Sequence, residues 1–104
     1  MRTGSINTVD EVVMALCLDY QRRAEIITAS SASRRTDTEL KYLNYKIYNA
    51  VSEISGDALA LAYIYEIGNK IGYAKSSATV SEVTYKNYKR LMKDNIAKKL
   101  HLCD

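Results

Sequence analysis

The stretch "ATVSEVTYKNYKRL", from Ala78 to Leu91, places a short polar turn before a segment rich in tyrosine, lysine and asparagine. Ser81 stands where the N-cap of a helix is expected, because its hydroxyl can accept a backbone N–H that the first helical turn leaves unpaired. After it, Tyr85, Tyr88 and Met92 recur at helical spacing. The stretch therefore predicts a capped helix with an apolar inward side and a basic, amide-rich outward side.

The residues before this helix predict a helix-turn-helix. Such a motif joins two helices through a short turn, and its helices approach closely where their facing residues are small. Counting from Ile71, Ala74 and Ala78 are small residues four apart, and the branched Val80 follows where the corner is expected. We therefore expect a supporting helix from Ile71 to Ala78, with these residues and Tyr85 facing the core.

The outward side of the second helix carries side chains of the types that contact DNA. A recognition helix enters the major groove with its N-terminal residues toward the bases. Thr84, Lys86 and Asn87 suit base edges, since asparagine pairs with adenine and lysine with guanine. Cations further along the helix suit phosphates, which fix the position of a protein without reading sequence. The predicted DNA-binding residues are Lys75, Ser81, Thr84, Lys86, Asn87, Lys89, Arg90 and Lys93.

The charge distribution agrees with an anionic partner for the C-terminal third. Residues 1–68 hold seven Lys and Arg against nine Asp and Glu, a formal charge of −2. Residues 69–104 hold eight Lys and Arg against three Asp and Glu, a formal charge of +5. This asymmetry favours nucleic acid as a partner, although a solubilising lysine face would look the same.

Composition favours one all-α domain. A chain of 104 residues is one domain by size. It has no proline and four glycines, so long helices are expected and a turn-rich all-β fold is not. We expect a compact bundle of four to five helices, in which residues 1–55 form an N-terminal helical pair with possible dimerisation and residues 57–104 form the helix-turn-helix DNA-binding part.

Capping boxes locate the two N-terminal helices. Thr8 to Glu11 fits a capping box and predicts a helix from about residue 9 to 27. The segment from Thr36 to Glu39 fits a second box and opens the next helix. Between them, the serine-rich segment from Thr28 to Arg35 is expected to be a flexible joint.

Gly56 is expected to end this second helix, and Asp57 is expected to cap the next one. That next segment, "ALALAYIYEI" from Ala58 to Ile67, is apolar nearly all round. Because a helix of this kind is usually buried, we expect it to be the central helix of the core.

The second helix shows two stripes, which leave two explanations open. One stripe is apolar and the other is formed by tyrosines, so the helix is apolar over more of its circumference than one neighbour covers. A homodimer contact and burial between neighbouring helices explain this equally well. The stripes are Leu40, Leu43, Ile47, Ala50, Val51 and Ile54, and Tyr42, Tyr45 and Tyr48.

Signals of other protein classes are missing from the sequence. The single histidine, His101, lies near the end of the chain, and no catalytic motif is present, so we expect no enzyme and no catalytic residue. Cys17 and Cys103 lack the spacing of a disulfide framework or a zinc site, so we expect no metal and no cofactor, with Cys17 a core thiol. No leader and no membrane-length apolar run is present, so a soluble, cytoplasmic protein is expected, without a membrane partner.

The span from about Tyr20 to Leu102 resembles the phage late-transcription regulators of the RinA/ArpU type, whose C-terminal part is similar to sigma-factor region 4. The resemblance rests on "RRTDTELKYLNYKIYNAVSEI", on a helix that ends near "AYIYEI", and above all on "VSEVTYKNYKRLMKDNIAKKLHL". The matching positions are Ser81, Thr84, Tyr85, Tyr88, Lys89, Arg90 and Ala97. The resemblance implies DNA binding near promoters and contact with RNA polymerase.

The sequence therefore predicts a phage-type transcriptional regulator that binds double-stranded DNA through its C-terminal recognition helix. Two other functions remain open. One is a small helical interaction module that docks on a host or phage protein through the second helix and its tyrosines. The other is a DNA-packaging factor similar to the DNA-binding part of a small terminase subunit.

Overall fold

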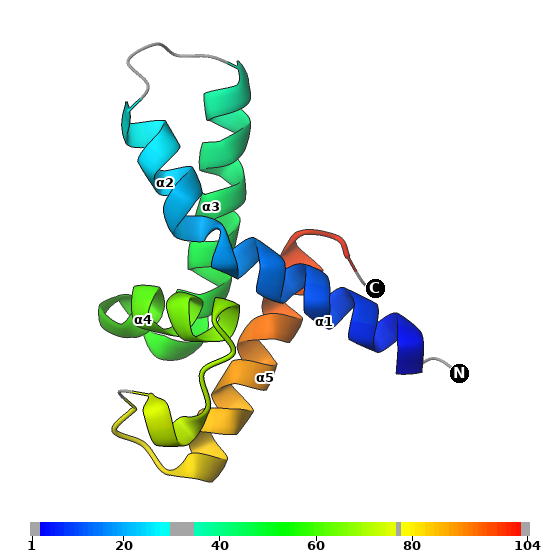
Figure 1. Ribbon diagram of the computed structural model, residues 1–104, viewed down its shortest axis with the longest axis vertical. Helices are drawn as coiled ribbons and strands as arrows, with labels where there is room; N and C mark the ends of the chain where they lie inside the picture. The colour runs from blue at the N-terminus through cyan, green and yellow to red at the C-terminus, as the bar shows by residue number, and fades with distance from the viewer. Residues whose placement is uncertain (1–2, 30–34, 77, 103–104) are drawn as a thin grey trace.

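The computed structural model describes residues 3–29, 35–76 and 78–102, and within these ranges every regular element is a helix (Figure 1). The described part of the chain measures 44 × 36 × 20 Å. The all-α fold that the sequence predicts is therefore confirmed. The elements are α1 Thr3–Leu18, α2 Tyr20–Ala29, α3 Arg35–Ser55, α4 Asp57–Gly68, the 3-10 turn η1 Tyr73–Lys75, and α5 Glu82–Lys99.

One core joins the N-terminal and C-terminal halves of the chain. Val13 of α1, Ile47 of α3, Ile64 of α4 and Met92 of α5 are each at most 2% exposed and belong to the same cluster. The helix α2 packs against α3, and the two form an arm that extends upward in Figure 1, away from α5. The core is thus built where α1, α3, α4 and α5 meet.

The predicted first helix is two helices with a bend at Asp19. Its start is also earlier than predicted, because α1 already begins at Thr3 and Thr8 lies inside it. Backbone hydrogen bonds continue on both sides of the bend, from Asp19 to Ala15 and from Arg23 to Asp19. The expectation of one capped helix from about residue 9 to 27 was therefore wrong at its start and in its continuity.

The bend at Asp19 is held by the side chain of Arg23. Arg23 is 8% exposed, and its guanidinium donates to the carbonyl oxygen of Leu16 and to Oδ1 of Asn44, at 2.6 Å each. The amide of Asn44 in turn donates to the carbonyl oxygen of Tyr20 at 3.2 Å. Burial lowers the pKa of Arg23 from its usual value. A buried cation stays charged where several acceptors surround it, and here these acceptors tie α1, α2 and α3 together.

The apolar stripe of the second predicted helix is buried within one chain. This helix is α3, and its Ile47, Ala50 and Val51 are 0% exposed. The partly buried Leu43 and Ile54 pack against the same core. Of the two explanations for the stripe, burial between neighbouring helices therefore accounts for these residues.

The break at Gly56 is where the sequence predicts it. Gly56 has a φ of 85°, in the left-handed region that favours glycine, and it separates α3 from α4. Gly56 itself occupies the N-cap position, so Asp57 is the first residue of α4 rather than its cap. The carboxylate of Asp57 accepts a hydrogen bond from the hydroxyl of Tyr48 at 3.3 Å.

The helix α4 is buried on one side, so the expectation of a helix buried all round was wrong. Ala60, Tyr63, Ile64 and Ile67 face the core. The opposite side faces solvent, and Leu61 and Tyr65 there are 56% and 61% exposed. At its C-terminal end, α4 crosses α1 so closely that a Cβ added to Gly68 would stand 2.5 Å from the backbone nitrogen of Leu18.

No α-helix supports α5 in the way that a helix-turn-helix requires. The segment between α4 and α5 contains the short 3-10 turn η1, and Ala74 in it is exposed. The expected supporting helix from Ile71 to Ala78 was therefore wrong. This segment is polar and contains Gly72, so its local preference for a helix is weak. Ala78 and Val80 pack against the core as expected.

Some sequence predictions fall partly outside the described residues. The expected joint from Thr28 to Arg35 has its first two residues in α2 and its last in α3, and residues 30–34 between them lie outside the described ranges. Cys103 also lies outside them, whereas Cys17 is a buried core thiol as predicted. Across residues 3–29, 35–76 and 78–102, no helix is long and apolar enough to span a membrane.

Candidate nucleic-acid interface

The N-terminus of α5 is capped by Ser81, as the sequence predicts. The Ser81 hydroxyl oxygen accepts the backbone N–H of Thr84 at 3.2 Å, and the same hydroxyl donates to Oγ1 of Thr84 at 3.0 Å. Just before the cap, the carbonyl oxygen of Val80 accepts a hydrogen bond of 2.8 Å from the hydroxyl of Tyr73. The entry to α5 is therefore fixed by side chains on both sides of the turn.

The inward side of α5 anchors the helix in the core. Tyr85, Met92 and Ile96 are each at most 1% exposed. The Tyr85 hydroxyl donates to Oε1 of the buried Glu66 on α4 at 2.7 Å, and its ring packs against that of Tyr63. Burial, followed by the bond to Glu66, raises the pKa of Tyr85 above its usual value. The first half of α5 is thus fastened to α4 by a buried polar contact.

The second half of α5 is fastened to α3. The side-chain amide of Asn95 donates to the carbonyl oxygen of Ala50 at 3.0 Å and to Oε1 of Glu53 at 2.9 Å. Glu53 also pairs with Lys99 at 3.0 Å, and these hydrogen bonds lower its pKa. The helix therefore has little freedom to move relative to the core.

Lys89 and Lys93 lie on the side of α5 that faces the rest of the chain. Lys89 falls between Tyr85 and Met92 on the buried stripe, and its Nζ donates to the carbonyl oxygen of Ile71 at 2.6 Å. Burial lowers the pKa of Lys89 from its usual value. Lys93 pairs with Asp10 of α1 at 3.1 Å. The expectation that both lysines lie on the outward face was therefore wrong, because the inward stripe of α5 is wider than its apolar residues suggest.

Four residues of α5 form the surface that we call the outer face: Val83, Lys86, Asn87 and Arg90. Val83 is 79% exposed, the largest exposed fraction among the exposed large hydrophobic side chains. Arg90 donates to the side-chain oxygen of Asn87, and Lys86 pairs with Glu82 at 2.9 Å. Both contacts are local pairs at helical spacing on an exposed surface, so they cost little to exchange for a partner.

The remaining predicted DNA contacts flank this outer face. Lys75 is exposed at the end of η1, and Ser81 is exposed at the cap. The Thr84 hydroxyl is engaged by Ser81 and is half-buried. The structure thus leaves Lys75, Ser81, Lys86, Asn87 and Arg90 exposed, whereas Thr84, Lys89 and Lys93 are half-buried against partners inside the chain.

Folding neutralises part of the positive charge of the C-terminal third. Lys86 and Lys98 pair with acids on α5 itself, and Lys93 and Lys99 pair with Asp10 and Glu53 from the N-terminal half. In the part of the chain that the structure describes, Lys70, Lys75 and Arg90 pair with no carboxylate. The exposed cations of the C-terminal third that remain without an acid therefore belong to the segment before α5 and to its outer face.

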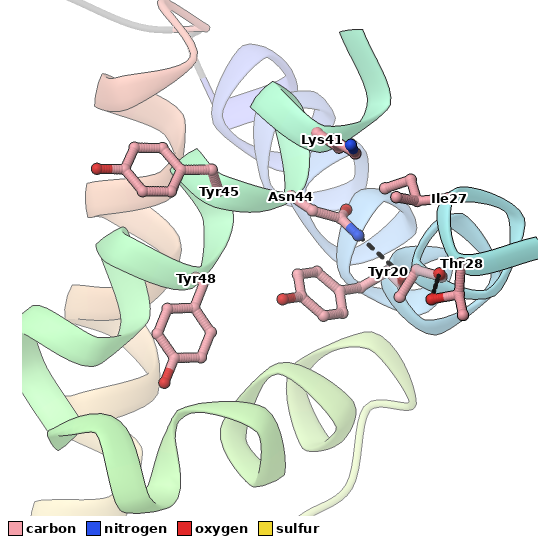
Figure 2. Close-up of a pocket in the computed structure, with 8 residues that line it drawn as sticks. Tyr20, Ile27, Thr28, Lys41, Asn44, Tyr45 and Tyr48 are labelled. Carbon is pink, nitrogen blue, oxygen red and sulfur yellow. Dashed lines mark hydrogen bonds between the residues drawn. The ribbon is translucent and has the colours of Figure 1, made fainter. Parts of the chain in front are cut away.

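A second candidate site is an open groove between α2 and α3. It encloses about 350 Å³ and is lined by three tyrosines, with Lys41 and Asn44 from α3 and Ile27 from α2. Figure 2 shows Lys41 and Asn44 pointing toward α2, whereas Tyr45 points away from it. The buried pair of Arg23 and Asn44 beneath this groove was missed from the sequence. Its signal is that Arg23 shares the helical face of Leu16, Tyr20 and Ile27.

Comparisons with family models, with curated proteins and with solved structures give no match for this chain. The resemblance to the phage regulators of the RinA/ArpU type therefore stays a prediction. Among the described side chains, no three His, Cys, Asp or Glu residues gather in a way that could hold a metal ion. Burial raises the pKa of the Cys17 thiol to about 12.

Proposed function

We propose that this protein binds double-stranded DNA through the outer face of α5. One observation carries the proposal: a capped, firmly anchored helix exposes an amide and two cations in its first three turns, at the lower end of the molecule in Figure 1. A helix that reads the major groove needs an exposed N-terminal part and a rigid mounting. The contacts to Glu66, Ala50 and Glu53 supply this mounting.

The proposed roles differ along the outer face. Asn87 contacts a base edge, since its amide has both a donor and an acceptor, as an adenine requires. Arg90 and Lys86 lie within one turn of Asn87 and contact a base or the adjacent phosphates. Val83 lies against a thymine methyl group or a sugar. Lys75 and Lys70 contact the sugar-phosphate backbone of the DNA on either side of the groove that α5 enters.

The number of accessible cations sets the expected salt dependence. Lys70, Lys75, Lys86 and Arg90 would neutralise three to four phosphates, so the logarithm of affinity should fall with the logarithm of salt with a slope of about −3 to −4. Lys89 and Lys93 contribute less than their charge suggests, because each would first have to leave a partner inside the chain.

Transcriptional regulation is part of the same proposal and rests on the resemblance to the phage regulators. The resemblance also supports contact with RNA polymerase. The proposed cytoplasmic location rests on the sequence. Since the described residues between α4 and α5 form no supporting α-helix, α5 would act as a reading helix that is held by α3 and α4 instead.

The test is a fluorescence anisotropy titration on a duplex selected from random DNA, and on a scrambled duplex. Arg90→Ala should weaken binding to the selected duplex at least about tenfold. Arg22→Ala is the matched control, because it also removes one exposed arginine but lies on α2, in the arm that extends away from α5 (Figure 1). If the two variants bind equally, net charge explains the affinity and the outer face does not.

Asn87→Ala separates sequence reading from charge, because the asparagine is neutral. The variant should lose about 1 to 3 kcal/mol on the selected duplex and little on the scrambled one. Equal losses on both duplexes would mean that α5 supplies no sequence information. A selection that enriches no sequence, together with a flat salt response, would remove the proposal.

The exposed tyrosines of α3 favour protein interaction as a second candidate function. Tyrosines are common at protein interfaces, and Tyr42 and Tyr45 on α3 are 59% and 63% exposed. Their substitution by serine should abolish this function and leave DNA affinity unchanged. The alternative of a DNA-packaging factor gains no support from a particular contact.

A further inference from the structure

The solvent-exposed side of α4 carries no charge beyond its first residue. Its exposed positions after Asp57 are Ala58, Leu59, Leu61, Ala62 and Tyr65, and all five are apolar or aromatic. We call these five residues the α4 face. Exposed helix sides in globular proteins are normally polar, and an apolar side marks a contact that one chain leaves uncovered.

Both flanks of the α4 face continue its apolar character. On one flank, Leu18 at the end of α1 is 54% exposed and lies against Gly68 of α4. On the other flank, Leu59 and Ala62 border a hollow of about 200 Å³ that Val80 and Tyr88 also line. The apolar surface is thus wider than one helix, with a hollow beside its small residues.

The ends of the α4 face carry opposite charges. Asp57 is the first residue of α4, and the exposed Lys70 lies two residues past Gly68, the last residue of α4. Lys70 makes no ion pair within the described ranges. If a second copy of the helix lies antiparallel, the two Asp57 side chains come near the two Lys70 side chains, and the helix dipoles also oppose each other favourably.

The same antiparallel arrangement places large residues on small ones. The midpoint between positions 57 and 70 falls between residues 63 and 64 of α4. The midpoint between positions 62 and 65 falls at the same place. When Asp57 of one copy faces Lys70 of the other, Tyr65 of each copy therefore faces Ala62 of the other. The ring of Tyr65 then has room beside Ala62, where the hollow opens. The face complements itself in shape as well as in charge.

We propose that the α4 face is the contact through which two copies of this chain pair, antiparallel and related by a two-fold axis that passes between Ala62 and Tyr65. The proposal does not depend on DNA binding, since no residue of the outer face of α5 takes part in it. Lys70 is the one residue that both proposals use, so Tyr65→Arg rather than a Lys70 variant separates them. It also differs from a dimer formed through α3, whose apolar stripe is buried within one chain.

The expected affinity is modest. Stable interfaces bury about 800 Å² of each partner, and one helix side with the flanking Leu18 lies toward the small end of this range. We therefore expect a dissociation constant on the order of 1 to 100 µM. Sedimentation equilibrium of the full chain, from about 1 µM to 1 mM, would measure it.

Tyr65→Arg tests the face directly. It should raise the dissociation constant at least about tenfold, because it puts a charge at the centre of the contact. Tyr45→Arg is the matched control, since Tyr45 on α3 is 63% exposed and Tyr65 is 61% exposed. Circular dichroism and urea unfolding below the dissociation constant establish that both variants are folded. Dissociation by Tyr45→Arg but not by Tyr65→Arg would overturn the proposal and place the contact on α3.

A charge exchange tests the antiparallel geometry. Lys70→Asp should weaken pairing, because it places the new carboxylate next to that of Asp57 in the second copy. The backbone φ of 56° at position 70 suits aspartate, so the substitution itself should not strain the chain. Asp57→Lys should weaken pairing as well, and the double variant should recover most of the loss. A protein that remains monomeric to about 1 mM would overturn the proposal, as would a double variant no tighter than the single ones.

Discussion

The helices α4 and α5 both have an apolar buried side, but the exposed side of α4 is apolar and that of α5 is polar and charged. Ile64 of α4 and Ile96 of α5 are each at most 2% exposed in the same core. Toward solvent, however, α4 presents alanine, leucine and tyrosine, whereas α5 presents lysine, asparagine and arginine. Because the fold needs only the buried sides, the difference between the exposed sides reflects what each helix meets outside the chain.

The first prediction concerns the buried sides and should show the largest effect. Ile64→Ala and Ile96→Ala should each lower the free energy of unfolding by about 2 to 5 kcal/mol, because each removes a fully buried side chain and leaves a cavity. Urea denaturation at low protein concentration measures both. Leu61→Ala, on the exposed α4 face, should change it by no more than about 0.5 kcal/mol under the same conditions. A loss above 2 kcal/mol for Leu61→Ala would mean that the α4 face is buried in the monomer.

The second prediction concerns the close crossing of α4 over α1. Gly68→Ala should lower the free energy of unfolding by about 1 to 3 kcal/mol, because its Cβ would stand 2.5 to 2.8 Å from backbone atoms of Leu18 and Cys17. Gly72→Ala is the control, since nothing lies within 4 Å of its added Cβ. Its φ of −83° is ordinary for alanine, so this variant should be neutral or more stable by up to about 1 kcal/mol. Equal stabilities for the two variants would contradict the close crossing.

The third prediction concerns the buried contact between the two helices. Tyr85→Phe should cost about 1 to 2 kcal/mol at pH 7, since it leaves a buried oxygen of Glu66 without that donor. The folded-state pKa of Tyr85 is raised above its usual value of 10, so folding disfavours its ionisation. Stability from this tyrosine is thus fully present below pH 10 and is lost as the pH rises above it.

The same variant should therefore show a shallower loss of stability between about pH 10 and 11, measured by urea denaturation. The raised pKa of Cys17 makes its own contribution to alkaline destabilisation, which begins above pH 9 and is common to both proteins. An unchanged slope above pH 10 in Tyr85→Phe would show that this tyrosine ionises as readily in the folded protein as in the unfolded one.

Local signals predicted the parts of the fold that depend on neighbouring residues. Ser81 as a cap and Gly56 as a break are set by side-chain and backbone properties within one turn. The helical spacing of Tyr85 and Met92 likewise identified the inward side of α5. These elements needed no knowledge of the rest of the chain.

Signals that depend on distant residues were missed or misjudged. The sequence predicted Lys89 and Lys93 to be surface cations. In the structure, Lys89 contacts the carbonyl oxygen of Ile71 and Lys93 pairs with Asp10, and both partners lie far away in sequence. The pairing of Lys99 with Glu53 cancels charge in the same way. The predicted face for DNA was therefore too wide and too positive, although its centre at Asn87 is exposed as expected.

The sequence of α4 is apolar nearly all round, and this pattern predicted a helix buried in the core. The structure buries only one side of that helix. A helix that is apolar all round is usually surrounded by its own chain. Here α1, α3 and α5 cover one side, and the remaining described helix, α2, packs against α3 and leaves the other side of α4 exposed. The pattern thus identified a helix that needs partners, without showing whether they come from the same chain.

The bend held by Arg23 has a consequence for the order of folding. Residues 3–29 contain no proline and one glycine, at position 4, so nothing local favours a bend at Asp19 over a straight helix. Of the two acceptors of the guanidinium, the carbonyl oxygen of Leu16 lies in the same segment, whereas Asn44, which joins the bend to α3, lies 21 residues further along the chain. An early helix spanning both α1 and α2 would therefore be straight, and it would acquire its bend when α3 docks. In kinetic terms, the contacts of Arg23 should form after the transition state and so slow unfolding more than they speed folding.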